Sequence, residues 1–158
     1  MAKAKSFVPE GYRTVTPHLT IAGAAAAIEF YQQAFGAEEI VRMPGPGGKL
    51  MHAEIKIGDS FLMLNDEFPE HPEMGGTLGP KAFGGSSVTI TLYVPDVDAV
   101  MARAAKAGAK VTMPASDQFW GDRYGQLVDP FGHRWAVATH KEELTPEEIG
   151  ERVQKMKG

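Results

Sequence analysis

An internal repeat restricts the fold of this 158-residue chain more than any other feature of its sequence. Stretches that alternate between apolar and polar residues occur at 13–21 and at 87–94, and each precedes a segment with apolar residues at helical spacing. Both helical segments end in Gly-Ala, at Gly36 and Gly108, where glycine suits the left-handed residue that commonly closes a helix. The chain therefore carries two copies of one supersecondary unit.

Each helical segment is followed by three strand-like stretches. The sequences "IGDS" and "DPFGH" are typical of tight turns that join the last two strands of each half. We therefore predict an α+β fold built from two βαβββ modules. The strands expected after the helices span 38–43, 49–57 and 60–65 in the first half and 110–115, 120–128 and 133–139 in the second.

The module boundaries follow from composition. We expect the first module over 8–66 and the second over 87–140. Residues 67–86 between them are rich in glycine and proline and lack periodicity, which predicts a linker or a loop over a site. In the tail, 141–158, "TPEE" matches the N-cap, first-turn proline and capping-box glutamate of a short helix.

Composition excludes several classes of function. The chain has no cysteine, which rules out disulfides, thiolate metal sites and a thiol nucleophile. Its net charge is −4 and no run of basic residues stands out, so we expect no nucleic-acid partner. No apolar run is long enough to span a membrane, and the start "MAKAKSFVPE" lacks the apolar stretch of a signal peptide. We expect a soluble, cytoplasmic protein.

Strand parity separates side chains that pack under a helix from those on the opposite face, because neighbours along a strand point to opposite sides. The residues expected on the helix side are Val15, Leu19, Ile21, Met51, Ala53, Ile55, Ile57, Val88, Ile90, Leu92, Val94, Trp135 and Val137. The opposite faces are rich in hydroxyl groups, which predicts a half-polar concave surface for a small-molecule ligand. The candidate ligand-binding residues are Thr16, His18, His52, Glu54, Thr89, Thr91, Trp120, Asp122, Tyr124, Gln126 and Arg134.

The segments "AIEFYQQAFGA", "HAEIKIGDSFLMLND" and "WGDRYGQLVDPFGHRWAVATH", set in paired βαβββ modules, resemble the vicinal oxygen chelate superfamily. That superfamily includes glyoxalase I, bleomycin-resistance proteins and extradiol dioxygenases, and the chain is most similar to its PhnB-like branch. The resemblance covers about residues 10–142. It implies two modules whose curved mixed sheets form a cleft, in a chain that assembles as a homodimer.

The resemblance also implies where a metal would be bound. Enzymes of the superfamily hold a divalent cation with histidine, glutamate or glutamine on the first and fourth strand of each module. Aligned by the helical segments, these positions fall at Thr16, Met63 (or Leu62 under a different count of the turn), Thr89 and Ala136. None of these side chains is a good ligand for a divalent cation. We therefore predict that the usual metal site is lost.

His18 lies two residues beyond Thr16 on the same predicted face. In the interpretation we favour, His18 lines the pocket and hydrogen-bonds to a neighbour or to water. In the alternative, His18, His52 and Glu54 form a shifted metal site, because two imidazoles and one carboxylate suit non-haem iron and leave open coordination positions.

Glu54 also has two interpretations. In one, an apolar pocket raises the pKa of its carboxyl group and Glu54 acts as a general base. In the other, which we favour, Glu54 forms an ion pair with Arg134, Arg123 or Lys56.

We therefore predict a protein that binds a small molecule without metal or other cofactor, with Trp120 and Tyr124 stacking on a planar ligand. The sequence leaves open whether the chain is an enzyme. The alternative is a lyase, isomerase or dioxygenase that uses a divalent metal or acid–base chemistry around His18, His52 and Glu54. Of the other histidines, we expect His133 to be structural and His71 and His140 to be solvated.

Overall fold

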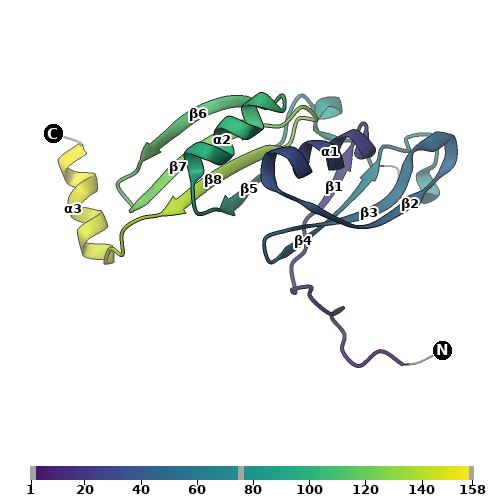
Figure 1. Ribbon diagram of the computed structural model, residues 1–158, viewed down its shortest axis with the longest axis horizontal. Coiled ribbons are helices and arrows are strands. Elements are labelled where there is room, and N and C mark those ends of the chain that lie inside the picture. The colour runs from purple at the N-terminus through teal and green to yellow at the C-terminus, as the bar shows by residue number, and fades with distance from the viewer. Residues whose placement is uncertain (1–2, 75–76, 157–158) are drawn as a thin grey trace. The chain divides into compact units, whose positions relative to one another are not determined.

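The computed structural model describes residues 3–74 and 77–156 (Figure 1). The chain divides into two compact units, Met1–Gly85 and Ser86–Gly158, and each is described by itself. Residues 75–76 of the expected linker and 157–158 of the expected tail lie outside the described residues.

The first unit contains one helix and a four-stranded mixed sheet in the order β1-β4-β3-β2. Strand β1 is parallel to β4, and the other two pairings are antiparallel. Three short 3₁₀ turns, Pro46–Gly48, Pro72–Met74 and Pro80–Phe83, lie in its connections. The helix and strands are β1 (His18–Ile21), α1 (Ala24–Phe35), β2 (Glu38–Pro44), β3 (Leu50–Ile57) and β4 (Ser60–Asp66).

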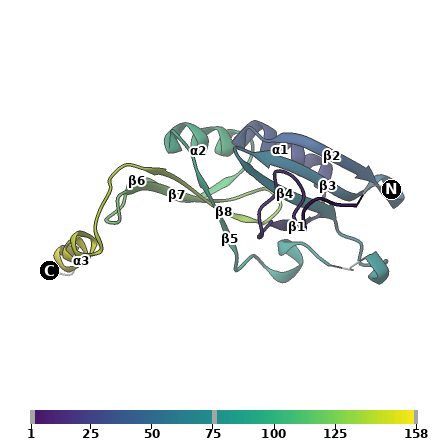
Figure 2. The same ribbon diagram turned by 90° about the horizontal axis from the view of Figure 1, so that it is seen from below.

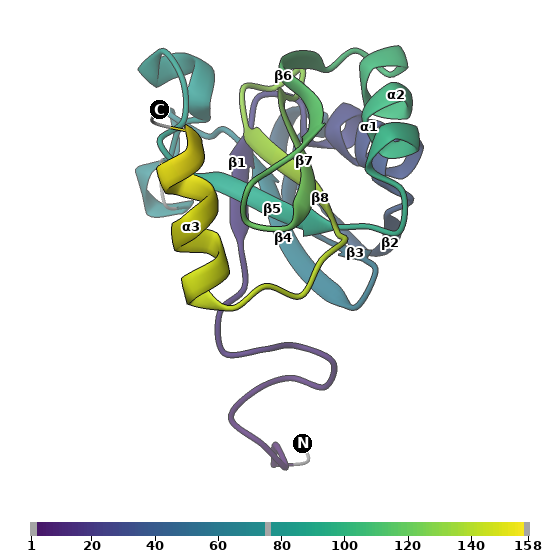
Figure 3. The ribbon, with the colours of Figure 1, turned by 90° about the vertical axis from the view of Figure 1, so that its left-hand side faces the viewer.

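The second unit repeats this topology with the sheet order β5-β8-β7-β6, so the predicted pair of βαβββ modules is confirmed. In each unit one α-helix lies against one face of its own sheet (Figure 2), and no α-helix of the described residues packs on the opposite face. A third helix follows β8 through an extended connection (Figure 3). The elements are β5 (Thr89–Tyr93), α2 (Val97–Lys106), β6 (Lys110–Asp117), β7 (Asp122–Val128), β8 (Arg134–His140) and α3 (Pro146–Met156).

The last strand of the first module fixes the start of its helix. Asp66, at the end of β4, accepts hydrogen bonds from the backbone N–H groups of Gly23 and Ala24, both at 2.9 Å. Its other carboxylate oxygen accepts from the N–H of Leu50 at 2.7 Å. Asp66 therefore satisfies two of the unpaired N–H groups at the helix start and ties β3 to the same point.

The second module uses the equivalent residue of its own last strand in the same way. The Thr139 hydroxyl accepts from the N–H of Val97 at 3.0 Å and donates to the carbonyl of Val94 at 2.8 Å. Asp96 adds the expected N-cap bond, accepting from Ala99 N–H at 3.0 Å. Asp66 and Thr139 each stand three residues after the directly aligned positions Met63 and Ala136, so the cap is part of the repeat.

The core contains many of the side chains that parity predicted on the helix side, while Ile90, Leu92 and Val94 are only half-buried. Trp135 is fully buried, and its indole N–H donates to the Asp129 carboxylate at 2.9 Å. The other carboxylate oxygen of Asp129 accepts from the N–H groups of Phe131 and His133 and holds the turn before β8. The largest fully buried side chains are Trp135, Tyr31, Ile21, Ile28, Ile55, Leu64, Leu127, Val97 and Val137.

Three predicted core residues are exposed. Val15 is 84% exposed because β1 begins only at His18, and Val88 is 65% exposed because it precedes β5. Met51 is 47% exposed, since a register shift between Met43 and Pro44 pairs Pro44 with Leu50 and leaves Met51 out of the ladder. Leu50 is buried in its place.

The glycine- and proline-rich segment 67–86 packs against the first module. Phe68 and Pro80 are buried. The N–H of Gly79 donates to the Glu67 carboxylate at 2.6 Å, and a hydroxyl–hydroxyl bond of 2.9 Å joins Thr77 to Thr20. In the described part of the chain, no helix is long and apolar enough to span a membrane.

Candidate functional site

The faces of the two sheets that carry no helix present equivalent positions. In each sheet a row of three directly opposite residues runs from the first strand through the fourth to the third: His18, Met63 and Glu54 in the first unit and Thr91, Ala136 and Gln126 in the second. Residues opposite each other across a ladder point to the same side of the sheet. His52 and Tyr124, two residues earlier on the third strand, form the next equivalent pair.

The first unit brings His18, His52 and Glu54 together on this face, as parity predicted. The His52 Nε2 atom lies 3.1 Å from Glu54 Oε1. The rings of His18 and His52 meet edge to face with centroids 5.9 Å apart. The strands that carry the histidines are not neighbours, because β4 runs between them, so the imidazoles reach each other across the side chain row of β4.

Tyr12 completes this first cluster from the irregular segment before β1. Its ring stacks on Phe61 with centroids 4.4 Å apart. Its hydroxyl is buried beside Glu54, although the contact falls outside ideal hydrogen-bond geometry. Burial, and then the neighbouring carboxylate, raises the pKa of Tyr12. Tyr12 therefore remains a neutral phenol at physiological pH.

Glu54 does not have the raised pKa of a buried general base. The Tyr12 hydroxyl lowers the pKa of its carboxyl group, and His52 lowers it further, while partial burial opposes both. The expected ion pair with a Lys or Arg is also wrong, since the Glu54 carboxylate pairs with His52. Arg123 instead pairs with Asp98 and Asp117 on the surface of the second unit.

The residues at the four positions that the resemblance implies for a metal do not pair across the sheets. Thr16 precedes β1, and the residue opposite Met63 is His18. In the second unit Ala136 lies opposite Thr91, whereas Thr89 lies opposite Arg134. Within residues 3–74 and 77–156, no three His, Asp or Glu side chains converge closely enough to hold a metal ion. Threonine, methionine and alanine do not fit a divalent-cation site.

The second unit builds its cluster around a buried carboxylate. The Asp122 side chain is 6% exposed. Its Oδ2 atom accepts from the Tyr93 hydroxyl and from the Trp120 indole N–H, both at 3.1 Å, and its Oδ1 atom lies 2.7 Å from His140 Nδ1. Asp122 thus holds three side chains from three different segments of the unit.

Two further contacts extend this cluster along β7. The rings of Trp120 and Tyr124 meet edge to face with centroids 5.4 Å apart. The Gln126 amide donates to the Tyr124 hydroxyl at 3.0 Å. Tyr124 and Gln126 occupy the positions that His52 and Glu54 occupy in the first unit. The two modules therefore form a side-chain contact at the same place with different chemical groups.

The electrostatics identify Asp122 as an acceptor that stays ionised. Burial alone would raise the pKa of Asp122, but hydrogen bonds from His140, Tyr93 and Trp120 together outweigh it and hold the pKa below its usual range. The contact between Asp122 and His140 raises the pKa of His140. Glu143, whose Oε1 atom lies 3.2 Å from His140 Nε2, raises it further. Asp122 therefore positions its neighbours and is not available as a base.

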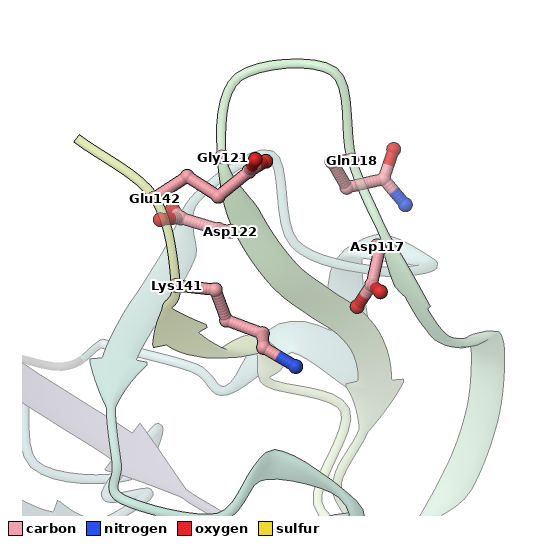
Figure 4. Close-up of a pocket in the computed structure, with 6 residues that line it drawn as sticks. All are labelled: Asp117, Gln118, Gly121, Asp122, Lys141 and Glu142. Atoms are coloured by element: carbon pink, nitrogen blue, oxygen red, sulfur yellow. The ribbon is translucent and has the colours of Figure 1, made fainter. Parts of the chain in front are cut away.

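The backbone beside Asp122 is held by Gly121, which has a φ of +100°. A Cβ atom there would lie 2.6 Å from the Glu142 carbonyl oxygen. The Gly121 carbonyl accepts from the N–H groups of both Lys141 and Glu142 at 3.0 Å. A small pocket of about 70 Å³ adjoins this point, well below the size usual for a drug-like ligand. Its lining residues are Asp117, Gln118, Gly121, Asp122, Lys141 and Glu142 (Figure 4).

Of the remaining candidates, Thr89 and Arg134 face each other at the opposite end of β5 and β8 from His140. Thr91 stands in the row of Gln126. Thr16 lies outside any strand.

The structure adds three residues to the predicted site: Tyr12, Tyr93 and His140. His140 shares the parity of Arg134, so extending the last predicted strand by one residue identifies it. Tyr93 stands between Leu92 and Val94, both predicted on the helix side, so parity places it on the opposite, hydroxyl-bearing face. Tyr12 lies in a segment without periodicity, and no sequence signal marks it.

Comparisons with known proteins agree with this architecture. A chain from Mycobacterium bovis, called an uncharacterized protein, is 47% identical over 135 residues, which cover 85% of this chain and 88% of that protein. The crystal structure of an Arabidopsis thaliana gene product superposes with a TM-score of 0.64 and 26% identity, covering 80% of this chain and 98% of that one. A PhnB protein from Bacillus cereus shares the fold, with a TM-score of 0.59, 20% identity and 80% and 99% coverage.

The family assignment rests on most of the chain. The profile of the Glyoxalase/Bleomycin resistance protein/Dioxygenase superfamily matches residues 15–137, which include both helices that pack on the sheets and all eight strands apart from the last residues of β8. The protein is therefore a member of the glyoxalase, bleomycin-resistance protein and dioxygenase superfamily.

Proposed function

We propose that this chain binds a small, planar organic molecule on the face of the second sheet that carries Trp120, Tyr93 and Tyr124. The observation that carries the proposal is the anchoring of two of these rings by one buried carboxylate, Asp122. Hydrogen bonds to an ionised acceptor are stronger than those between neutral groups, so the rings are fixed before a ligand arrives. A site that is fixed in advance loses less conformational entropy when it binds.

The exposure of the rings supports a stacking role. Tyr93 is 66% exposed, and Trp120 and Tyr124 are half-buried, so each presents part of its ring to solvent. An aromatic pair contributes about 0.5–1.5 kcal/mol beyond the area it buries. Three rings of this kind, with the Gln126 amide beside them, favour a planar ligand that also forms a hydrogen bond.

Binding without chemistry is the role we assign to this face. The two Asp122 oxygens are both occupied by donors, and the low pKa of the carboxyl group makes it a poor proton acceptor. The name of the superfamily includes drug-resistance proteins, and we propose the same class of activity here, sequestration of a small molecule in the cytoplasm by a homodimer.

Intrinsic fluorescence tests the proposal. The chain has two tryptophans, and Trp135 is fully buried while Trp120 is not. Saturable quenching by bleomycin or by 2-naphthylmethanol in the wild type, and its loss in Trp120→Phe, is the expected result. Failure of both probes, and of a wider panel of planar compounds, to change either the emission or the melting temperature would refute the proposed function.

A second candidate function, acid–base catalysis, is favoured by the first cluster. Glu54 is held ionised and pairs with His52, an arrangement in which a carboxylate orients an imidazole that can act as a base. Hydrogen–deuterium exchange at the methyl group of pyruvate, followed by NMR, tests this function. Accelerated exchange that disappears in His52→Gln supports it, and exchange at the buffer rate in the wild type counts against it.

A further inference from the structure

The Asp122 cluster contains one group whose charge changes near neutral pH. The His140 side chain is 49% exposed, and each of its ring nitrogens faces a carboxylate: Nδ1 lies 2.7 Å from Asp122, and Nε2 lies 3.2 Å from Glu143. Only the imidazolium form can donate from both nitrogens. The geometry therefore fits protonated His140 between two acceptors.

Other ionisable groups reach this point from every element of the unit that packs against it. The hydroxyl of Tyr93 on β5 donates a hydrogen bond to Asp122 on β7, and this bond, followed by partial burial, raises the pKa of Tyr93. Asp117 on β6 and Lys141 in the tail line the adjoining pocket. Glu142 and Glu143 of the tail lie at the same end of the unit, and Arg152 of α3 pairs with Glu142 at 2.7 Å.

Histidine is the side chain in this set that ordinarily changes its charge between about pH 5 and pH 8. Aspartate, glutamate, lysine and arginine side chains in general keep their charge throughout that interval. The charge of the aromatic face therefore changes by one unit when His140 loses its proton.

Loss of the proton changes the charge without removing the anchor. The neutral imidazole keeps one N–H, and the shorter contact, to the buried Asp122 carboxylate, retains it at Nδ1. Nε2 then presents a lone pair to Glu143, whose side chain is 95% exposed and can turn into solvent. Trp120 and Tyr93 keep their bonds to Asp122, whose charge is no longer compensated.

We propose that His140 sets the charge preference of the aromatic face, and through it the class of ligand that the face accepts. With His140 protonated, the face takes neutral or anionic planar molecules. With His140 neutral, the face favours planar cations, since an uncompensated carboxylate and aromatic rings both attract positive charge. This inference rests on the proposed function, because it assigns a ligand class to the same site.

Charged quenchers of Trp120 fluorescence test the charge of the face without any ligand. Iodide, caesium and acrylamide report on access by an anion, a cation and a neutral molecule, and the fully buried Trp135 supplies a constant background. As pH rises through the pKa of His140, we expect iodide quenching to fall and caesium quenching to rise, each about two- to threefold. Acrylamide quenching stays constant because the position of the ring does not change.

Two variants separate the effect of His140 on quenching from the effect of other groups that titrate in the same pH range. His140→Gln keeps a donor toward Asp122 but carries no charge, so its iodide-to-caesium ratio is expected to stay flat with pH. His133→Gln removes the only other histidine of the second unit and is expected to behave like the wild type. An iodide-to-caesium ratio that does not change while NMR shows His140 titrating would overturn the role of His140, as would a parallel change in acrylamide quenching.

A matched pair of ligands tests the preference itself. 2-Naphthylmethylamine and 2-naphthylmethanol have nearly the same shape and differ by one positive charge. The ratio of their affinities is expected to shift toward the amine by about three- to tenfold between pH 5.5 and pH 8.5 in the wild type and not in His140→Gln. Failure of both compounds and of the wider panel of planar compounds to bind at any pH overturns the proposed function and with it the ligand preference, whereas binding with a constant ratio overturns the role of His140 alone.

Discussion

Truncation of Asp122 tests whether one buried carboxylate organises the aromatic face. Asp122→Ala removes the acceptor for Tyr93, Trp120 and His140. A hydrogen bond to a charged group contributes about 1.5–3 kcal/mol. Tyr93 is 66% exposed and the His140 side chain 49% exposed, so water replaces the carboxylate at both of them after truncation.

The loss therefore comes mainly from the bond to the half-buried Trp120, with partial losses at the other two donors. We expect Asp122→Ala to lower the free energy of unfolding by about 2–3 kcal/mol. In urea denaturation, with a slope of about 2–3 kcal/mol per molar for a chain of this size, the midpoint falls by about 1 M. In the folded Asp122→Ala variant, acrylamide quenching of Trp120 is expected to rise, because the indole N–H has lost its acceptor.

Asp117→Ala is the matched control. Asp117 is also an acidic residue of the second unit, but its side chain is 69% exposed and its partner, Arg123, has a second ion pair with Asp98. An exposed ion pair contributes less than about 1 kcal/mol. If Asp122→Ala costs no more than Asp117→Ala, or if it leaves Trp120 equally shielded, Asp122 does not organise the face.

Three further predictions follow from other contacts. Asp66→Ala removes the acceptor for three backbone N–H groups and is expected to cost about 2–4 kcal/mol in urea denaturation, against a cost within about 0.5 kcal/mol for the exposed Asp59→Ala. Gly121→Ala places a Cβ 2.6 Å from a backbone oxygen at a φ of +100°, so we expect a loss of about 1–3 kcal/mol and altered amide shifts over 141–145; unchanged shifts would show that the backbone there relaxes freely. Because the pKa of His140 is raised in the folded state, the stabilisation by its protonated form is present below the unfolded value of 6.5 and is lost as pH rises through the folded pKa. Over that interval the urea midpoint of the wild type is expected to fall more than that of His140→Gln. An equal fall of the urea midpoint with pH in both proteins would contradict the role of His140.

Alternation predicted the central strands well because their neighbours cover one face and leave the other polar. Ala53, Ile55 and Ile57 of β3 are buried as expected, and His52 and Glu54 share the opposite face. Alternation does not mark where a strand stops pairing with its neighbour in the sheet. The alternating pattern therefore predicted a first strand that reaches back to Val15, whereas β1 begins at His18 and Val15 is 84% exposed.

Two other differences have local causes that a single sequence does not display. The exposure of Met51 arises from the register shift opposite Met43, and a bulge of this kind depends on the partner strand. The predicted partners of Glu54 were Arg134, Arg123 and Lys56, whereas its carboxylate pairs with His52. Parity places His52 and Lys56 on the same face as Glu54, one on each side of it, so parity alone does not decide between them.

The two modules show how this fold separates stability from chemistry. Asp66 and Thr139 cap the helices from equivalent positions with different side chains, and the His52–Glu54 and Tyr124–Gln126 contacts stand at equivalent positions of β3 and β7. The two capping residues are bonded to backbone on the helix side and fix the module. The two side-chain pairs lie on the opposite face and contribute little to the core. Because residues two apart on a strand share a face whatever their side chains are, the module can exchange an imidazole–carboxylate pair for a phenol–amide pair without repacking. The two polar faces therefore differ in side-chain chemistry, which is why we propose acid–base character for the first and stacking for the second.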